Sequence, residues 1–374
     1  MTRTLVVTND FPPRPGGIQA FVQALVERLP PADVLVYTSS WSGDREYDAR
    51  QPFEVRRART SMLLPTPGVA RALARVVQDE DISSVWFGAA APLGLLAPRL
   101  REAGARRLVA TTHGHEAGWA ALPGARSLLR RIARHVDVMT YLGDYTCARL
   151  AHAVGPHTRL ERLAPGVDAT VFRPDPDGRR AVRERVGLSG RPIIVCVSRL
   201  VARKGQDVLI RALPSIREQV PDAALLVVGE GPYRRQLERL AAERGVEGDV
   251  VFTGSLPWAE LPDYFAAGDV FAMPCRTRRR GLDVEGLGIV YLEASATGLP
   301  VVAGDSGGAP DAVLEGVTGT VVDGRSVEAV RDSVVGYLTD PDRARAAGAA
   351  GREWVQREWT WEGSAARLTE LLRP

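Results

Sequence analysis

Short apolar runs alternate along the chain with longer stretches in which apolar residues recur every three or four positions. The run at 4–10 ("TLVVTND") ends in polar residues and predicts a buried strand, and 18–29 ("IQAFVQALVERL") has the spacing of an amphipathic helix. Between them, 11–17 ("FPPRPGG") has the composition of a loop. The chain therefore begins with a strand, a glycine-containing turn and a helix.

The same alternation continues through the first half of the chain. Further strands are predicted at 33–38, 84–90, 107–113, 136–142 and 158–168, and helices at 68–78 and 125–135. Strands that alternate with helices are typical of a parallel, doubly wound sheet. The segment 168–192 is rich in Pro, Gly and charge and is predicted to be a linker.

A second series of strands and helices follows the linker. Strands are predicted at 193–200, 223–231, 249–256, 270–275, 300–308 and 318–323, with helices at 208–219, 233–245, 261–269 and 288–298. The segment 351–372 predicts one or two amphipathic helices. We expect two Rossmann-like α/β domains, 1–174 and 175–355, facing a central cleft, with 356–374 as a helix that packs back on the first domain. Ligands of such sheets bind beyond the carboxyl ends of the strands.

Composition narrows the class of protein. Hydrophobic residues make up 45% and charged residues 25% of the 374 residues, as in a globular protein with a substantial core. The net charge of +3 is too small to indicate nucleic-acid binding, but residues 1–174 hold 22 Arg against 16 Asp and Glu, a net of +6. This basic half suits an anionic partner or membrane surface, or it is simply solvated surface arginine.

The cysteines and apolar runs indicate a cytosolic protein. Cys147, Cys196 and Cys275 are widely spaced and form no metal or disulfide pattern. The N-terminus has the pattern of a strand rather than of a signal peptide. The longest apolar run, 85–98, is broken by Pro and Gly and is too short to cross a bilayer.

Lys204 is the only lysine among the 48 basic residues. Since arginine stands at every other basic position, this position is expected to require a compact ammonium group, unless the lysine has survived by chance at a neutral position. Arg199 directly follows a predicted strand, and Lys204 opens the next helix. Two cations beside helix-start amides predict an anion site that would suit a diphosphate. The alternative is a basic loop in solvent.

Two glutamates stand in the apolar stretch 281–302 ("GLDVEGLGIVYLEASATGLPVV"). A helix that starts near Gly288 would aim the amides of Gly288, Ile289 and Val290 at a phosphate. Glu285 would precede this helix and Glu293 would lie inside it, each able to accept hydrogen bonds from vicinal hydroxyl groups. The alternative is a pair of acids that stabilise the helix dipole.

The first domain offers further candidates. His113 follows a predicted strand in "THGHEAGW" (112–119), beside His115 and Glu116, and is expected to bind a sugar hydroxyl or support the reacting carbon, unless its role is structural. Gly16 and Gly17 precede a predicted helix, where the missing side chains would let the backbone approach a phosphate.

Other chemistries find little support in the sequence. The acidic motifs at 79–81, 175–177 and 340–342 lie at a helix end or in proline turns, so no metal site is expected. The loop at 11–17 is not GxGxxG, which argues against a dinucleotide-dependent dehydrogenase.

Taken together, the motifs resemble those of a known family. Glu285-x7-Glu293 in "EGLGIVYLEA", with "SRLVARKG" and "GEGP" upstream, resembles the retaining glycosyltransferases of family 4, which have the GT-B fold. The resemblance is strongest to actinobacterial enzymes that transfer mannose from GDP-mannose to a phosphatidylinositol monomannoside. The stretches that carry it are "TNDFPPRPGGIQ", "THGHE", "RLVARKGQD", "GLDVEGLGIVYLEA" and "SGGAPDAV", and they span most of the chain.

The resemblance implies a role for each matching residue. Arg199 and Lys204 would neutralise the leaving diphosphate, and the amides at 287–290 would bind its phosphates. Glu285 would bind mannose hydroxyls, Glu293 the ribose, and the backbone of Leu256 the guanine. Gly17, with Gly16, would close over the phosphates, and His113 would lie beside the anomeric carbon. The acceptor would contact Asn9, Asp10, Gln19 and His113.

The resemblance also implies partners and a location. The donor would be GDP-mannose, without a metal cofactor, and the acceptor a phosphatidylinositol mannoside lipid. The protein would associate peripherally with the inner face of the plasma membrane, where the basic segment 118–135, with Trp119, Leu122, Arg126, Arg130, Arg131 and Arg134, would rest on anionic lipid, unless it is an ordinary surface helix.

Two points stay open. Arg278, Arg279 and Arg280 stand where the family pattern commonly has glycines, and they would contact an acceptor phosphate or remain solvated. Alternative functions are a family-4 enzyme with another nucleotide sugar or a soluble acceptor, and a non-catalytic nucleotide-sugar-binding protein.

Overall fold

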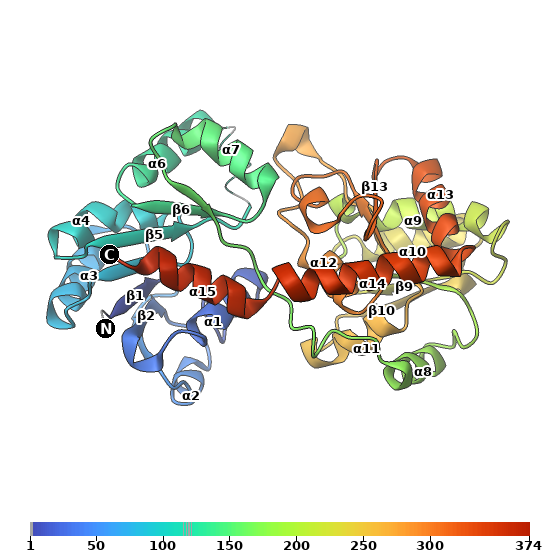
Figure 1. The fold of residues 1–374 in the computed structure, drawn as a ribbon, viewed down its shortest axis with the longest axis horizontal. Coiled ribbons are helices and arrows are strands. Elements are labelled where there is room, and N and C mark those ends of the chain that lie inside the picture. Colours follow the sequence, from blue (N-terminus) through green and yellow to red (C-terminus); the bar gives the residue numbers. More distant parts are fainter. Residues whose placement is uncertain (1–2, 115, 117, 119, 121) are drawn as a thin grey trace. The chain divides into compact units, whose positions relative to one another are not determined.

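The chain folds into two compact units. The computed structural model describes residues 3–114, 116, 118, 120 and 122–374 (Figure 1). Unit 1 comprises Met1–Gly166 and Trp361–Pro374, and unit 2 comprises Val167–Thr360. The sequence pattern placed these boundaries after residues 174 and 355.

Unit 1 is built on a parallel sheet of seven strands in the order β3-β2-β1-β4-β5-β6-β7. The strands are β1 (Thr4–Val7), β2 (Val34–Ser39), β3 (Glu54–Ala58), β4 (Ser84–Phe87), β5 (Arg107–Thr111), β6 (Val138–Tyr141) and β7 (Leu160–Arg162). Chain order reverses between β1 and β4, so this is a doubly wound sheet, as the alternating pattern predicted.

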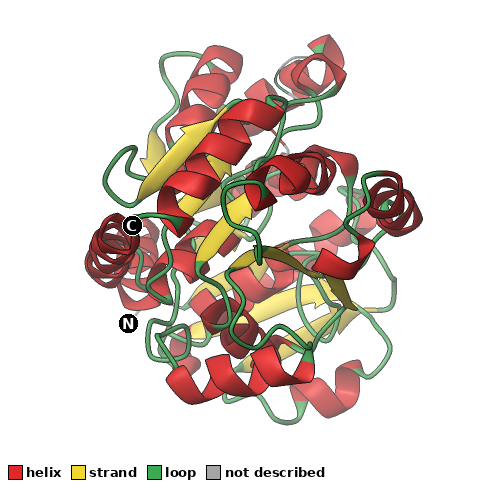
Figure 2. Cartoon of the chain, turned by 90° about the vertical axis from the view of Figure 1, so that its right-hand side faces the viewer, coloured by secondary structure: helices red, strands yellow, loops and turns green. Residues whose placement is uncertain are grey.

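Successive residues of these strands belong to two separate hydrophobic cores, because neighbouring side chains point to opposite faces of a sheet. Leu5 and Val7 belong to one buried core with residues of α3 (Pro67–Asp79), α4 (Ala97–Glu102), α6 (Pro123–Ala133) and α7 (Asp144–Val154). Val6 belongs to another, with residues of α1 (Gly17–Val26) and α15 (Trp361–Leu372). Figure 2 shows helices stacked against the strands. The helices are α1 (Gly17–Val26), α2 (Asp44–Asp48), α3 (Pro67–Asp79), α4 (Ala97–Glu102), α6 (Pro123–Ala133), α7 (Asp144–Val154) and α15 (Trp361–Leu372).

Strand β3 was absent from the sequence prediction. It carries Arg56 and Arg57 where a buried strand would have apolar residues. Its position at the sheet edge leaves the Arg56 side chain partly exposed. The Arg57 side chain is only 8% exposed and forms an ion pair of 2.8 Å with Asp48. A charged edge strand is a common feature of natural sheets and leaves no apolar signal in the sequence.

Unit 2 repeats the architecture with six parallel strands in the order β10-β9-β8-β11-β12-β13. They are β8 (Ile193–Val197), β9 (Ala224–Val228), β10 (Val250–Gly254), β11 (Val270–Met273), β12 (Val301–Gly304) and β13 (Gly319–Val322). All six were predicted. The order reverses between β8 and β11, and ligands of such sheets bind at this reversal, beyond the strand carboxyl ends.

The helices of unit 2 include one inside the expected linker. They are α8 (Pro176–Arg185), α9 (Gln206–Arg217), α10 (Arg234–Glu243), α11 (Leu261–Ala266), α12 (Ile289–Ala296), α13 (Val327–Leu338) and α14 (Pro341–Glu358). The prediction of a linker at 168–192 was wrong over α8. Asp175 caps this helix, and Arg183 of the helix forms an ion pair of 2.7 Å with Asp269. The charged residues that indicated a linker therefore form contacts that stabilise the fold.

Candidate functional site

Three loops meet at the carboxyl end of the unit 2 sheet. They follow β8, β11 and β12, and glycine permits their close approach. A Cβ on Gly205 would lie 2.0 Å from the carbonyl oxygen of Pro274, and one on Gly308 would lie 2.2 Å from that of Gly286. Arg276 and Asp207 tie the first two loops together through hydrogen bonds of 2.9 Å. The loops that carry the predicted cations and Glu285 are therefore packed against one another.

An ion cluster of three side chains lies where these loops meet. Lys204 Nζ is 2.6 Å from Oε2 of Glu285, and Nη1 of Arg203 donates a hydrogen bond of 2.5 Å to the same oxygen. Lys204 and Glu285 are only 8% and 7% exposed, so the pair is largely removed from water. Sequence reasoning missed Arg203, although its position directly before Lys204 was a signal.

The charges around Glu285 determine its protonation. Burial by itself would raise the pKa of Glu285, but the attraction of Lys204 and Arg203 outweighs it and holds the pKa below its ordinary value. Glu285 is therefore a carboxylate at neutral pH, able to accept hydrogen bonds from a ligand.

Glu293 lies in a different environment. Its side chain is 8% exposed, and in the described part of the chain no hydrogen bond or ion pair reaches its carboxyl group. Burial raises the pKa of Glu293 to about 7. A buried carboxyl without a partner is unfavourable and suits a site where a ligand supplies the hydrogen bonds.

The start of α12 lies between the two glutamates. Gly288 precedes the helix in a left-handed conformation (φ 82°), and among the described residues no side chain caps the first turn. The amides of Ile289 and Val290 thus belong to a helix N-terminus, which favours an anion.

Arg199 and Leu256 follow β8 and β10 at the same end of the sheet. Arg199 is exposed, and no described residue pairs with its guanidinium group, while its carbonyl oxygen accepts a hydrogen bond of 3.1 Å from Gln206. Leu256 is half-buried. The structure thus gathers the predicted unit 2 residues at one edge of the sheet.

The three consecutive arginines form the tip of a small hairpin. Arg278 and Asp283 pair through both backbone amides at 2.9 and 3.3 Å. Arg279 and Arg280 lie in the left-handed region, with φ values of 49° and 54°, and all three arginines are exposed. Whether they contact an acceptor phosphate stays a prediction.

In unit 1, His113 lies just beyond the carboxyl end of β5. Its Nε2 is 2.6 Å from the carbonyl oxygen of Gly88, which follows β4, and its ring packs edge-on against Phe21 of α1 at 5.2 Å. The amide of His113 donates a hydrogen bond of 2.9 Å to Glu116. His115, which was named with it, lies outside the described residues.

The loop after β1 carries the other unit 1 candidates. Gly17 begins α1, and Gly16 lies against the Gln19 side chain, where a Cβ would be 2.2 Å from Oε1. Gln19 donates a hydrogen bond of 2.8 Å to Asp10. Asp10 and Gln19 are therefore one connected group at the strand end.

Asn9 is engaged with a second loop. Its amide nitrogen donates to the carbonyl oxygen of Leu63 at 2.9 Å, and its oxygen accepts from the Leu63 amide at 2.6 Å. The Asn9 side chain thus pairs with the Leu63 backbone as a neighbouring strand would, and it holds the loop that follows β3. Asn9 was predicted to contact the acceptor, and this geometry gives it a structural task as well.

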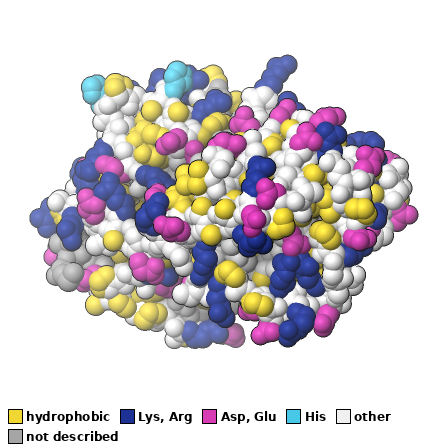
Figure 3. Space-filling model, turned by 45° about the vertical axis from the view of Figure 1, so that its right-hand side comes forward, with side chains coloured by type: hydrophobic (Ala, Val, Ile, Leu, Met, Phe, Trp, Pro, Cys, Tyr) yellow, Lys and Arg dark blue, Asp and Glu magenta, His cyan; other side chains and the backbone are white. Residues whose placement is uncertain are grey.

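The predicted membrane segment includes α6. Leu122, before it, is 46% exposed, and Arg131 and Arg134 are exposed, while Nε of Arg130 donates to the carbonyl oxygen of Ala153 at 2.6 Å. Trp119 lies outside the described residues. On the face drawn in Figure 3, basic and acidic side chains are interspersed. None of the helices described is long and apolar enough to cross a membrane.

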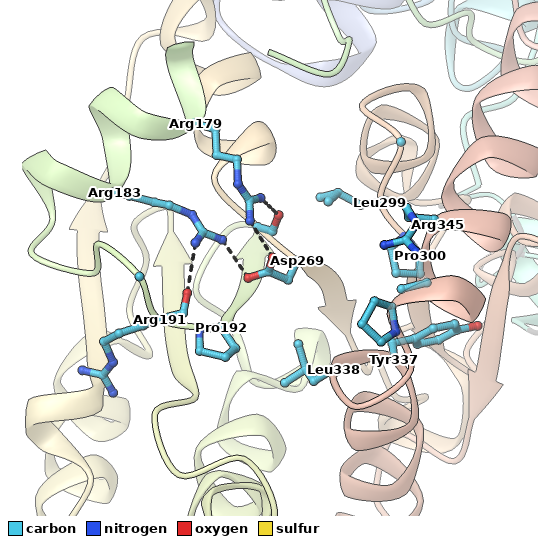
Figure 4. A pocket seen from close by; sticks show the side chains of 15 residues that line it. Arg179, Arg183, Arg191, Pro192, Asp269, Leu299, Pro300, Tyr337, Leu338 and Arg345 are labelled. Atoms are coloured by element: carbon cyan, nitrogen blue, oxygen red, sulfur yellow. Dashed lines mark hydrogen bonds and ion pairs between the residues drawn. The ribbon is translucent and has the colours of Figure 1, made fainter. Parts of the chain in front are cut away.

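A pocket of about 420 Å³ lies at the opposite, amino-terminal end of the unit 2 sheet (Figure 4). Its arginines are engaged in structural contacts: Arg179 and Arg183 bind Asp269 at 2.6 and 2.7 Å, and Arg183 also donates to the carbonyl oxygen of Arg191. These bonds fasten α8 to the sheet. We therefore assign the candidate site to the carboxyl end.

The arrangement in unit 2 suits the binding of an anion next to hydroxyl groups. Cations and helix amides would take the anion, and two carboxyl groups would accept from hydroxyls. The described residues contain no cluster of three or more His, Cys, Asp or Glu side chains able to hold a metal ion.

Two doubly wound parallel sheets, the second with this site at its switch point, are the architecture expected of a GT-B glycosyltransferase. Residues 15–171 match the family model described as Glycosyltransferase Family 4, and residues 179–354 match Glycosyl transferases group 1. The chain belongs to this glycosyltransferase family.

Two curated relatives match this chain over almost their full length. The chain is 57% identical to the GDP-mannose-dependent alpha-(1-6)-phosphatidylinositol monomannoside mannosyltransferase of Mycolicibacterium smegmatis, over 98% of this chain and 97% of the relative. A relative in Corynebacterium glutamicum, the GDP-mannose-dependent monoacylated alpha-(1-6)-phosphatidylinositol monomannoside mannosyltransferase, is 48% identical over 99% of this chain and 98% of its own.

Solved structures agree in fold. Anabaena HepE in complex with UDP superposes with a TM-score of 0.83 at 19% identity, over 99% of both chains. Sucrose-phosphate synthase from Thermosynechococcus elongatus superposes with a TM-score of 0.79 at 22% identity, over 99% of this chain and 98% of that one.

Proposed function

We propose that this protein transfers mannose from GDP-mannose to the inositol 6-position of a phosphatidylinositol monomannoside, with retention at the anomeric carbon. The observation that carries the proposal is the buried Lys204–Glu285 pair beside the start of α12, whose first turn is capped by no side chain that the structure describes. This arrangement suits a sugar diphosphate. The chain is 57% and 48% identical to two mannosyltransferases over almost their full length, and this similarity supports the choice of donor and acceptor.

The residues divide the reaction between them. Arg199, Lys204 and the amides at 287–290 stabilise the diphosphate as the bond between the anomeric carbon and the phosphate oxygen breaks. The acceptor oxygen forms the new bond on the same face, and its proton passes to the departing phosphate. Glu285 holds mannose hydroxyls, Glu293 the ribose, and the backbone of Leu256 the guanine. The unit 1 residues with a proposed role in the reaction are His113, Gly16, Gly17, Asp10 and Gln19. Asn9 contributes indirectly, because it holds the loop that contains Leu63.

Transfer is tested with purified protein, GDP-mannose and the monomannosylated lipid in detergent. We expect a dimannosylated lipid with an α-(1→6) linkage in the presence of EDTA, since no metal is assigned a role. The Lys204→Ala variant serves as the control for contaminating enzymes. No product from folded wild-type protein under sensitive detection would refute the proposal, and transfer only to a soluble inositol phosphate would reassign the acceptor.

The donor base is tested separately by calorimetry with GDP, UDP and ADP. GDP is expected to bind most tightly. Tight binding of UDP alone would overturn the guanine assignment.

We further propose that the protein binds the inner face of the plasma membrane through its basic first unit. Flotation with vesicles that contain phosphatidylinositol should recover it at low salt, and vesicles of neutral phosphatidylcholine should not. Equal recovery with both vesicle types would contradict an electrostatic attachment.

A further inference from the structure

The ion cluster contains one more cation than the proposed reaction uses. Lys204 is assigned to the diphosphate, but Arg203 has no assigned role, although its Nη1 lies 2.5 Å from Glu285 Oε2. Lys204 Nζ lies 2.6 Å from the same atom. Two cations therefore share one buried carboxylate oxygen.

A bound diphosphate changes the balance of charge around Glu285. It brings negative charge to Lys204, whose single positive charge is then shared between the phosphates and Glu285. A carboxylate that is 7% exposed and loses its counter-charge becomes unfavourable and tends to take up a proton. A protonated Glu285 would be a poorer acceptor for sugar hydroxyls. Donor binding thus requires a second cation that stays with Glu285.

We propose that Arg203 is the positioning residue that keeps Glu285 ionised and oriented toward the sugar while the diphosphate engages Lys204. This role rests on the proposed function, because it assigns a nucleotide sugar to the site.

The structure holds Arg203 in a position that fits this role. Its Nε lies 3.4 Å from Asp283 while its Nη1 binds Glu285, so the guanidinium fork spans two carboxylates. Its carbonyl oxygen accepts a hydrogen bond of 2.8 Å from the Arg276 amide. Both ends of the residue are therefore fixed to the loop that carries Glu285.

Two other titratable groups around Glu285 stay neutral at pH 8. Burial raises the pKa of Cys275 to about 11 and that of Tyr291 well above its ordinary value, so both are neutral there. Asp283 stays close to Arg278, at 3.8 Å, and is partly exposed. Glu293, with a pKa of about 7, is present in wild type and variants alike, so its contribution cancels in a comparison.

The test measures proton uptake when GDP-mannose binds at pH 8, by calorimetry in two buffers with different ionisation enthalpies. Neither phosphate of GDP-mannose titrates near neutral pH, so uptake reports on the protein. For Arg203→Met we expect at least tenfold weaker binding than for wild type and additional uptake that approaches one proton. The affinity of this variant should also recover as the pH is lowered to 6.

Matched variants separate this role from a general loss of charge. Arg203→Lys should restore most of the affinity and remove most of the extra proton uptake. Arg211→Met, on an exposed position of α9, removes an arginine from the same segment and should behave as wild type. In an E285Q background, Arg203→Met should weaken binding no further, because no carboxylate remains to be paired.

Two results would overturn the inference. One is wild-type affinity and proton count in Arg203→Met. The other is an equal loss of affinity in the E285Q background, which would mean that Arg203 contacts the diphosphate directly. Circular dichroism verifies the fold of each variant, and if R203M alone fails to fold, the comparison of R203M/E285Q with E285Q decides. Failure of wild type to bind GDP-mannose would refute the proposed function instead.

Discussion

At the scale of single residues, Lys204 is both the only lysine of the chain and a buried partner of Glu285. Its compact ammonium fits between loops whose backbones approach closely at Gly205. The structure thus supplies a reason why arginine, with its wider head group, would be unsuited to this position.

Lys204→Ala is expected to lower turnover by more than tenfold, because the charge that stabilises the departing diphosphate is lost. The measurement is kcat for mannosyl transfer at saturating donor and acceptor. The kcat of Lys204→Arg, which keeps the charge in a wider group, should lie between those of wild type and Lys204→Ala. A near-normal rate for the alanine variant would rule out a role for Lys204 at the phosphates.

Glu293 leads to a prediction about stability and pH. Its pKa of about 7 in the native protein lies above the ordinary 4.5, so the native state holds the proton more tightly than the unfolded chain. The stability that this group contributes is complete below about pH 4.5 and is lost as the pH rises to about 7. The difference in pKa corresponds to roughly 3 kcal/mol.

Glu293→Gln removes this titration. Between pH 4.5 and 8, the unfolding free energy of the variant should rise relative to wild type by up to about 3 kcal/mol, measured by urea unfolding at a series of pH values. A constant difference between the two proteins over this range would show that Glu293 has an ordinary pKa.

At the scale of elements, the start of α12 depends on Gly288. Its φ of 82° is unfavourable for other residues, and a Cβ would lie 2.5 Å from the Tyr291 ring. That ring is fully buried and its hydroxyl donates a hydrogen bond of 2.7 Å to the carbonyl oxygen of Met273, so it has little freedom to move away. The helix start that we assign to the phosphates is thus set by one glycine.

Gly288→Ala is expected to lower the unfolding free energy by roughly 1–3 kcal/mol and to weaken GDP-mannose binding. Gly248→Ala is the control, since a Cβ there meets no atom within 4 Å, and it should change stability by less than about 0.5 kcal/mol. Thermal unfolding and calorimetry provide the two readouts. If both variants bind donor equally well, the α12 amides do not form part of the site.

At the scale of the whole molecule, the chain returns to unit 1 at its end. Helix α15 follows α14 of unit 2, yet Leu368, Leu371 and Leu372 are buried in the core of unit 1 with Phe21 and Val22 of α1. The first unit is therefore completed by the last residues of the sequence.

Leu368→Ala is expected to destabilise unit 1 by about 2–5 kcal/mol, because it leaves a cavity in this core. Hydrogen exchange should show faster exchange throughout unit 1, with unit 2 protected as in wild type. Leu64→Ala, at a side chain that is 49% exposed, is the matched control and should have little effect. Equal loss of protection in unit 2 would mean that the two units unfold together.

Much of the fold and part of the site follow from local patterns. Apolar runs of strand length predicted all six strands of unit 2 and six of the seven in unit 1, since each buried parallel strand must be apolar on both faces. The lone Lys204, the Glu285-x7-Glu293 spacing and the position of Gly288 are likewise visible in the residues. Lys204 and the helix start predict an anion site and the glutamates predict hydroxyl binding, and these ligand roles stay predictions.

Tertiary structure decided what depends on contacts between distant segments. Arg203 and Glu285 are 82 positions apart, and Asn9 and Leu63 are 54 apart, so no local pattern announces either contact. Strand β3 is charged because it lies at an edge, and α8 looked like a linker because its arginines bind Asp269 far along the chain. Periodicity and spacing are local properties of a chain, whereas the pairing of charges is settled only when folding brings separate loops together.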